Sequence, residues 1–438
     1  MTFKVNKQTT SWQWLMLLFV GFLAIAITSC GDDAIEEMEE MQEEQVVPDP
    51  EVESAVLQIT SVRNPGGDAV IYATVTPEVA ENFDISQAVE LGINVAIETF
   101  EDDMFVINAS SSTITKYSVD RTTLDLQVEG ILSFASTGIT STRTLVFASA
   151  TRAFISDLLE GSILEFNPET MEIANTFDVS VPVTDVPENL NLFIFQGYLT
   201  NGGKVVWPID YNAGPACCDD PVPLEVMPSI AVFDPATNQL TYKSDARLPL
   251  GNRSFQGGDG SVYLTSASWM GFFQNYFGSV PDAGFHIVRL DDNGDFETDY
   301  GFAAEGLIDV DYGGDINAVQ GDEALIRYND IEAWPESYEQ RWSWWGDPAF
   351  SFDAVVNLSD NTFRMFDGFD EYGLGVGNIG SIDGKNYYAA YTAVTVGWEE
   401  GEQPFEVELI RQESFDNFTT VQTGFPQNAG ISLITTLW

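Results

Sequence analysis

The sequence has few of the residues on which most catalytic and nucleic-acid-binding proteins depend. It contains one histidine, three cysteines and only 17 lysines and arginines, against 68 aspartates and glutamates, which gives a formal net charge of −51. Because phosphate contacts need clustered cations, this balance excludes nucleic acid as a partner. The single histidine, His286, lies inside an apolar run and is expected to be structural. A serine–histidine–acid triad therefore has one candidate base, and histidine-rich metal catalysis has no ligands.

Long amphipathic helix patterns are also missing beyond residue 55, where 76–88 and 151–160 are the best short candidates. Six segments instead combine an apolar run, a polar turn rich in Asp, Asn, Pro or Gly, and a second alternating run, which is the pattern of a β-hairpin. They are residues 114–127, 163–175, 230–243, 286–299, 354–366 and 408–421. Their recurrence is typical of a repeat architecture.

Each hairpin is preceded by another apolar run, and some of these runs follow a further short segment, such as 92–98 or 377–382. The preceding runs are residues 104–109, 144–149, 204–208, 261–265, 324–328 and 385–392. Four strands per unit indicate a propeller blade, and the all-β class follows. A further blade can be built if strands 55–62 and 69–75 pair with 431–438, which closes the ring and removes open edges. We predict a seven-bladed β-propeller over residues 55–438, with six or eight blades as alternatives.

The N-terminus is organised as a lipoprotein signal peptide over residues 1–29. Two lysines precede an apolar run, 14–27, that is too short to span a bilayer comfortably as a permanent helix. Residues 27–31, Ile-Thr-Ser-Cys-Gly, resemble a bacterial lipobox with Ile where Leu is usual. The resemblance implies cleavage before Cys30 and acylation of that residue, for example with palmitate. Ordinary secretion with an incidental cysteine is the alternative.

An acidic tether is expected to follow over residues 30–54. Eleven acids and no lysine or arginine occur between Asp32 and Glu53. Like charges extend such a segment, which cannot form a core. The acidic stretch directly after Cys30 also resembles the surface-export signal of some Gram-negative outer-membrane lipoproteins.

Four predicted blades carry a long connection between their second and third strands, at residues 210–228, 266–284, 331–351 and 394–404. In a propeller these connections emerge on one face. Loops of this length in a compact domain are usually functional or disordered, and the aromatic content of two of them argues against disorder. Rigid aromatic side chains suit ligand stacking and protein contacts.

The candidate ligand-binding residues come from these two loops: Trp269, Phe272, Tyr276, Trp334, Tyr338, Arg341, Trp342, Trp344 and Trp345. A small satellite core formed by the same rings is the alternative interpretation. Arg341 has its own alternative, which is stacking on a neighbouring ring rather than reaching a ligand.

Two further motifs lie in predicted connections. Cys217 and Cys218 are adjacent, and in an oxidising compartment they are predicted to form a strained disulfide with each other. Intermolecular pairing, free thiols, or a metal site with the following acids remain open. Residues 291–295, Asp-Asp-Asn-Gly-Asp, resemble a calcium loop, but the twelfth position holds Ala303 instead of Glu, so a hairpin turn is predicted. No metal or other cofactor is expected.

The lipobox, the acidic tether and the blades with aromatic loops together resemble Gram-negative outer-membrane β-propeller lipoproteins. Some of these sit beside TonB-dependent transporters and capture iron–siderophore complexes. The resemblance implies a non-enzymatic binding protein, lipid-anchored at the outer membrane, at the cell surface or facing the periplasm. Its partner would be a small-molecule or glycan ligand, or a TonB-dependent transporter. Since cations are scarce, an uncharged or aromatic ligand fits better than an anionic siderophore.

Two other classes of function remain. A carbohydrate-active propeller enzyme, hydrolase or lyase, could use paired carboxylates, although no spacing singles out a pair among 68 acids. A structural protein-interaction propeller would use the aromatic loops only as core.

Overall fold

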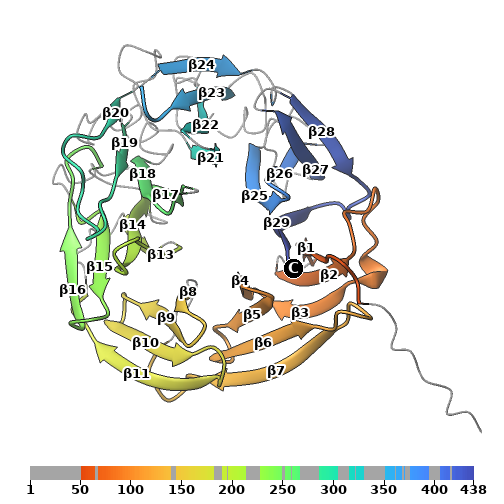
Figure 1. The fold of residues 1–438 in the computed structure, drawn as a ribbon, viewed down its shortest axis with the longest axis horizontal. Coiled ribbons are helices and arrows are strands. Elements are labelled where there is room, and N and C mark those ends of the chain that lie inside the picture. The colour runs from red at the N-terminus through yellow and green to blue at the C-terminus, as the bar shows by residue number, and fades with distance from the viewer. Residues whose placement is uncertain are drawn as a thin grey trace, which may run out of the picture. The chain divides into compact units, whose positions relative to one another are not determined.

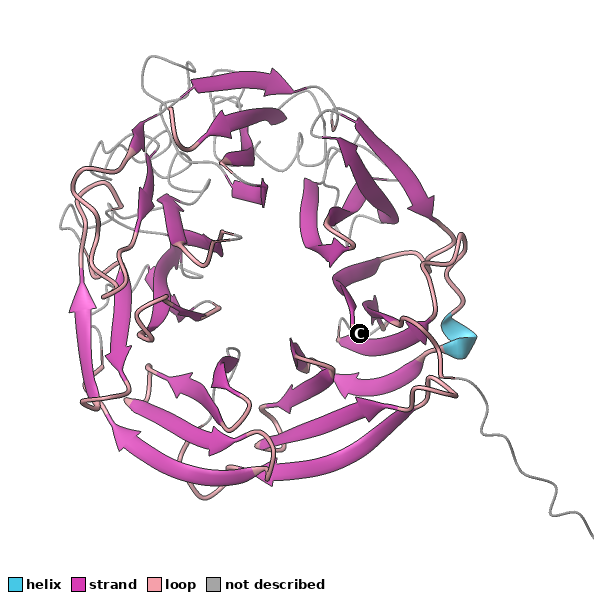
Figure 2. Ribbon diagram, viewed as in Figure 1, coloured by secondary structure: helices cyan, strands magenta, loops and turns pink. Residues whose placement is uncertain are grey.

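Strands make up nearly all the regular structure of this protein (Figure 2). The computed structural model describes residues 51–64, 68–139, 145–181, 190–194, 196–213, 227–248, 252–257, 259–266, 286–303, 315–320, 322–329, 351–360, 362–366, 369, 375–393, 405–414 and 417–438. Within them are 29 β-strands and one short 3-10 helix, η1 (Ile85–Gln87). Among the described residues, no helix is long and apolar enough to cross a membrane.

The strands of residues 51–438 form seven sheets that follow one another around a ring, so the predicted seven-bladed propeller is confirmed (Figure 1). We number the blades in chain order. Blade 1 comprises β4 (Ala96–Phe100), β5 (Asp103–Asn108), β6 (Thr113–Val119) and β7 (Leu126–Ser133). Blade 2 comprises β8 (Leu145–Ser149), β9 (Arg152–Asp157), β10 (Ser162–Asn167) and β11 (Glu172–Asp178). Blade 3 comprises β12 (Leu190–Ile194), β13 (Tyr198–Leu199), β14 (Val205–Ala213), β15 (Ile230–Asp234) and β16 (Gln239–Lys243).

The remaining blades repeat this arrangement, with the first strand innermost. Blade 4 comprises β17 (Asn252–Gln256), β18 (Val262–Ser266), β19 (His286–Arg289) and β20 (Phe302–Ala303). Blade 5 comprises β21 (Asp315–Gln320), β22 (Glu323–Asn329), β23 (Ser351–Asn357) and β24 (Thr362–Phe366). Blade 6 comprises β25 (Gly375–Ile382), β26 (Lys385–Ala393), β27 (Phe405–Ser414) and β28 (Asn417–Gln422). Blade 7 comprises β29 (Ala429–Thr436), β1 (Val56–Arg63), β2 (Ala69–Thr76) and β3 (Val89–Ile93).

Blade 7 joins the two ends of the propeller, as predicted. The C-terminal strand β29 is its innermost strand and pairs antiparallel with β1, from Val56 opposite Thr436 to Val62 opposite Ala429. Beyond the strand, the Leu437 amide donates to the Ala55 carbonyl at 2.9 Å. The indole of Trp438 donates to the Val52 carbonyl at 3.1 Å. The edge of β1 that faces the ring axis is therefore paired rather than open.

One buried apolar cluster lies between each pair of neighbouring blades, including the pair formed by blades 7 and 1. Between blades 1 and 2, for example, Phe105, Phe134 and Phe166 are completely buried. Between blades 7 and 1, Leu57 packs in a cluster with Val106. Burial of apolar surface stabilises by about 25 cal/mol per Å², so these clusters hold the blades together.

The same kind of turn joins the third and fourth strands in blades 1, 2 and 3. Each of these turns begins with Asp or Asn, which explains the similarity. The first carbonyl accepts from the amide four residues later at 2.8 Å in each case, and that later residue has a positive φ. The pairs are Asp120 with Leu124 (φ 62°), Asn167 with Met171 (φ 54°) and Asp234 with Asn238 (φ 58°). The side-chain oxygen of the first residue accepts one or two further backbone amides. Short polar side chains are suited to this role.

The predicted turn at residues 291–295 is confirmed by its hydrogen bonds. One carboxylate oxygen of Asp291 accepts from the backbone amides of Asn293 and Asp295, both at 2.8 Å. Gly294 has a φ of 69°, which glycine adopts without strain. A strand was expected to begin directly after this turn. Instead a single bridge joins Leu290 to Phe296, and the fourth strand of the blade, β20, begins only at Phe302 and is two residues long.

Two strand assignments and both helix candidates from the sequence were wrong. Residues 144–149 were expected to form a second strand, but β8 is the first strand of blade 2. Its second strand is β9, within the segment 151–160 that resembled a helix. Residues 92–98 were expected to form one strand, but the chain turns at Asn94, whose φ is 52°, and divides into β3 and β4. Of the helix candidate 76–88, only η1 forms a helical turn.

Replacement of Leu57 by Ala should destabilise the propeller by about 2–5 kcal/mol, because it opens a cavity between blades 7 and 1. Leu57 is 0% exposed, whereas Val128 on the outer strand β7 is 57% exposed. Val128→Ala is therefore the control and should change the free energy of unfolding by less than about 0.5 kcal/mol. Urea denaturation measures both variants. Equal effects would contradict the packing described here.

Candidate ligand-binding site

The two faces of the ring carry different connections. Neighbouring strands are antiparallel in every blade. The connection from the second to the third strand therefore lies on one face of the ring. The turns that join the first to the second strand and the third to the fourth strand lie on the opposite face. In blades 3 to 6 this connection is long. It covers residues 214–229, 267–285, 330–350 and 394–404. The prediction of four long connections in consecutive blades on one face is confirmed. We call this the long-loop face, and the opposite one the turn face.

The predicted site residues lie outside the described residues. This holds for the nine aromatic-loop candidates, Trp269, Phe272, Tyr276, Trp334, Tyr338, Arg341, Trp342, Trp344 and Trp345, and for Cys30, Cys217 and Cys218. Their roles therefore stay predictions, as do the domain boundaries at residues 29 and 54. What the structure does describe is a cavity near the long-loop face, formed by strands of the ring itself.

This cavity, which we call the Glu98 cavity, has a volume of about 840 Å³ and involves blades 7, 1 and 3. Its apolar lining comes from strands and strand ends near the long-loop face: Ala69, Ile71, Val95, Ala96, Ile97, Ile107, Ala109 and Leu433. Its polar lining consists of Ser61, Asn94, Glu98, Gln196 and Ser432. A mainly apolar cavity of several hundred cubic ångströms with a few polar groups is typical of small-molecule sites.

Glu98 lies on the innermost strand of blade 1, at a position where the strand pattern calls for an apolar residue. Side chains alternate along β4, so Glu98 shares a side of the strand with Ala96 and Phe100, which pack towards blade 2. Ile97 points the other way and packs towards blade 7. An ionisable group is thus placed among apolar neighbours near the ring axis.

Burial raises the pKa of Glu98 from 4.5 to about 7, an effect that a hydrogen bond with Gln196 partly opposes. The accessible surface of Glu98 is small but not zero. Its pKa places the change between the neutral acid and the carboxylate close to neutral pH. Near pH 7 this side chain can therefore either donate or accept a hydrogen bond.

A second partly buried polar group, Tyr198, interacts with Glu98. Tyr198 on β13 donates its phenolic hydrogen to the Ser254 carbonyl of β17 at 3.0 Å. Burial raises the pKa of Tyr198, and the negative charge of Glu98 adds to that effect. Innermost strands of blades 1, 3 and 4 thus bring polar groups together near the ring axis.

Among the described residues that line this cavity, Glu98 is the one carboxylate. Within the described part of the chain, no cluster of three or more His, Cys, Asp or Glu is arranged to hold a metal ion. The arrangement can enclose an apolar body and hydrogen-bond one polar group.

Sequence reasoning missed the Glu98 cavity because its lining comes from segments separated by more than 300 residues, from Ser61 to Leu433. One signal was present. In the strand Ala-Ile-Glu-Thr-Phe of residues 96–100, an acid occupies an innermost-strand position.

No family model and no curated protein matches this sequence. Among solved structures, AztD from Citrobacter koseri is similar over 87% of this chain and 98% of its own, with 10% identity and a TM-score of 0.45. The β-propeller domain of the Trilobed protease from Pyrococcus furiosus, which has an open velcro topology, covers 85% of this chain and 95% of its own, at 10% identity and a TM-score of 0.42. Virginiamycin B lyase from Staphylococcus aureus covers 85% and 94%, at 9% identity and a TM-score of 0.40.

The class that this structure defines is the seven-bladed β-propeller. At such identities and TM-scores the three similarities carry no argument about function. The names include a lyase, so they do not separate an enzyme from a binding protein.

The raised pKa of Glu98 predicts a specific pH dependence of stability. Folded Glu98 keeps its proton up to about pH 7, while the unfolded side chain loses it near pH 4.5. The contribution of Glu98 to the free energy of unfolding is therefore complete below pH 4.5, where both states are protonated. It is lost as pH rises through 7. Glu98→Gln should be more stable than the parent at pH 8, by about 3 kcal/mol, and equal to it near pH 4.

Urea denaturation at pH 4, 6 and 8 measures this difference. Glu90→Gln, on the outer strand β3, is the control, since Glu90 is exposed. A Glu98→Gln variant whose stability relative to the parent is the same at all three pH values would contradict the assignment.

Proposed function

We propose that this protein is a non-enzymatic binding protein that holds a small, uncharged ligand on its long-loop face. The observation that carries the proposal is the Glu98 cavity, because it combines apolar and polar lining groups and lies towards the face on which the four long connections leave their strands. The aromatic side chains predicted for two of those connections, such as Trp342 and Trp345, would extend the binding surface.

The electrostatics disfavour an anionic ligand. The net charge of −51 repels anions, and near pH 7 Glu98 exchanges between a neutral and a negative form. Ser61, Asn94 and Ser432 offer neutral hydrogen-bonding groups. A ligand with an apolar or aromatic body and one or two polar groups matches this lining.

The proposed location is the outer membrane, through a lipid on Cys30. The sequence of residues 27–31 and the acidic run that follows support this part of the proposal. A TonB-dependent transporter is then the proposed macromolecular partner. The tether over residues 30–54 would hold the propeller away from the bilayer, and the lipid would be its one attachment to the membrane.

A neutral dye tests the cavity. Nile red should bind the full chain with increased fluorescence, because the cavity offers apolar surface to the dye. Ala109→Phe, which fills the cavity, should weaken the dye's affinity by at least about tenfold, corresponding to about 1.4 kcal/mol. Ser110→Phe, on the exposed neighbour of Ala109, is the matched control and should leave the affinity unchanged.

The aromatic loops are tested in the same titration. Replacing both Trp342 and Trp345 by Ala should also weaken binding if these rings extend the site. Affinities that are unchanged in Ala109→Phe and in the double variant would show that the dye binds elsewhere and would contradict the proposal.

Metabolic labelling with palmitate in a Gram-negative host tests the anchor. The parent chain should carry the label and sediment with outer membranes, whereas Cys30→Ser should lose the label and leave the membrane fraction. Cys217→Ser is the control and should remain labelled. Label retained by Cys30→Ser would overturn the lipoprotein assignment.

A further inference from the structure

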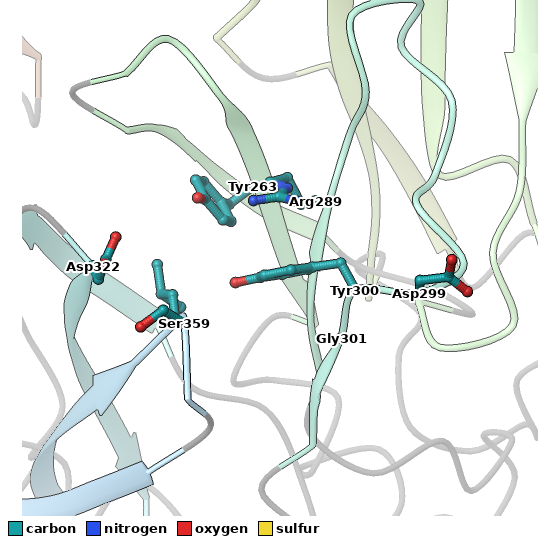
Figure 3. A pocket seen from close by; sticks show the side chains of 8 residues that line it. Tyr263, Arg289, Asp299, Tyr300, Gly301, Asp322 and Ser359 are labelled. Atoms are coloured by element: carbon teal, nitrogen blue, oxygen red, sulfur yellow. The ribbon is translucent and has the colours of Figure 1, made fainter.

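We propose a second ligand site on the turn face, in a cavity between blades 4 and 5, and we infer that it takes one unit of a neutral sugar. The cavity has a volume of about 360 Å³. Blade 4 supplies Tyr263, Arg289, Asp299, Tyr300 and Gly301, and blade 5 supplies Asp322, Leu358 and Ser359 (Figure 3). This proposal is independent of the Glu98 cavity, because it concerns different blades and the opposite face.

The position on the turn face follows from the strands. Arg289 is the last residue of the third strand of blade 4, where the chain enters its outer turn. Asp322 lies in the turn between β21 and β22, and Ser359 lies in the turn between β23 and β24. Both kinds of turn emerge opposite the long connections.

Aromatic rings form one wall of this cavity. Tyr263 stacks on Phe255, with ring centroids 5.0 Å apart and an interplanar angle of 3°. Tyr300 meets Tyr263 edge to face, at 5.9 Å and 64°. The guanidinium of Arg289 lies 4.4 Å from the centroid of the Tyr300 ring. Each ring is thus fixed by at least one neighbour, so the wall is formed before any ligand arrives.

Two arginines hold the segment that carries Tyr300. Arg247 donates to the carbonyls of Tyr300 and Glu297, at 2.7 and 3.2 Å. Arg289 binds the Glu297 carboxylate through two nitrogens, at 3.0 and 2.6 Å. Arg247 is paired in the same way with Asp245. Both cations are therefore balanced by carboxylates, and neither is left to attract an anionic ligand.

The Tyr300 hydroxyl has an unmet hydrogen-bonding capacity. It is covered by protein and has no hydrogen-bond partner among the described residues. Figure 3 shows it directed from blade 4 towards the side where Asp322 and Ser359 of blade 5 lie. An unpaired buried hydroxyl costs about 1–3 kcal/mol. A ligand hydroxyl that displaces the atoms covering it and bonds with it would recover part of that free energy.

These groups together select the class of ligand. The carboxylate of Asp322 can accept hydrogen bonds from hydroxyl groups, and the tyrosine rings offer flat apolar surface to the C–H side of a sugar ring. An anion would be repelled by this carboxylate. An organic cation could not stack on the face of Tyr300 that Arg289 already occupies. A neutral, polyhydroxylated ring satisfies all three constraints.

Saturation-transfer NMR on the full chain tests this site with glucose, galactose, mannose, maltose and cellobiose as probes. At least one sugar should show transfer, and calorimetry then gives its affinity. Tyr300→Phe keeps the ring and removes the hydroxyl, and Asp322→Asn removes the charge. Each variant should weaken that affinity by about tenfold or more, since one hydrogen bond to a charged or buried group is lost.

Asp383→Asn is the matched control, because Asp383 occupies the corresponding turn between β25 and β26 of blade 6 and is exposed. It should leave the sugar affinity unchanged, as should Ala109→Phe in the Glu98 cavity. Circular dichroism melting of each variant confirms folding. The proposal is overturned if no sugar binds, if choline binds in place of sugars, or if Tyr300→Phe and Asp322→Asn both bind as tightly as the parent.

Discussion

The pairing of β29 with β1 is the constraint on which the rest of the structure depends. A blade buries its apolar sides only against its two neighbours, as in other repeat architectures. Without this pairing, blade 7 would lack its innermost strand, and the cluster around Leu57 would lose Leu437. Because the two strands come from opposite ends of the propeller, the chain completes its last interface only when both ends are in place.

Closure of the ring also determines on which face each ligand cavity can form. Once the blades are fixed in a ring, every connection from second to third strand emerges on one face and every hairpin turn on the other. The Glu98 cavity belongs to the first face and depends directly on closure, since Ser61 and Leu433 in its lining come from β1 and β29. The cavity beside Tyr300 belongs to the second face. One rigid scaffold thus offers two chemically different surfaces.

Much of the fold could be predicted because its causes are local. Alternation of apolar residues along 114–127, with Asp120 at the turn, indicates a hairpin without reference to the rest of the chain. Blade count followed from repetition. The errors came where local signals conflict: in β9, residues 153–157 are all buried, so the period-2 pattern disappears. At residues 92–98, one turn residue with positive φ separates two blades.

The site could be predicted only in part. The sequence located the long connections, because their length is visible directly, and their aromatic residues remain a prediction. It did not reveal either cavity, because each combines residues from different blades, such as Glu98 with Gln196 or Tyr300 with Asp322. Packing between blades, rather than pattern along a strand, brings those residues together.

Native-state hydrogen exchange of the amides in β29 tests ring closure most directly. If β29 completes the last blade, those of its amides that are hydrogen-bonded to β1 should open only with the whole propeller, with the same opening free energy as the amides in the middle of β1 and β26. Exchange of β29 that is orders of magnitude faster, while β26 stays protected, would show that the C-terminal strand does not close the ring and would contradict this account.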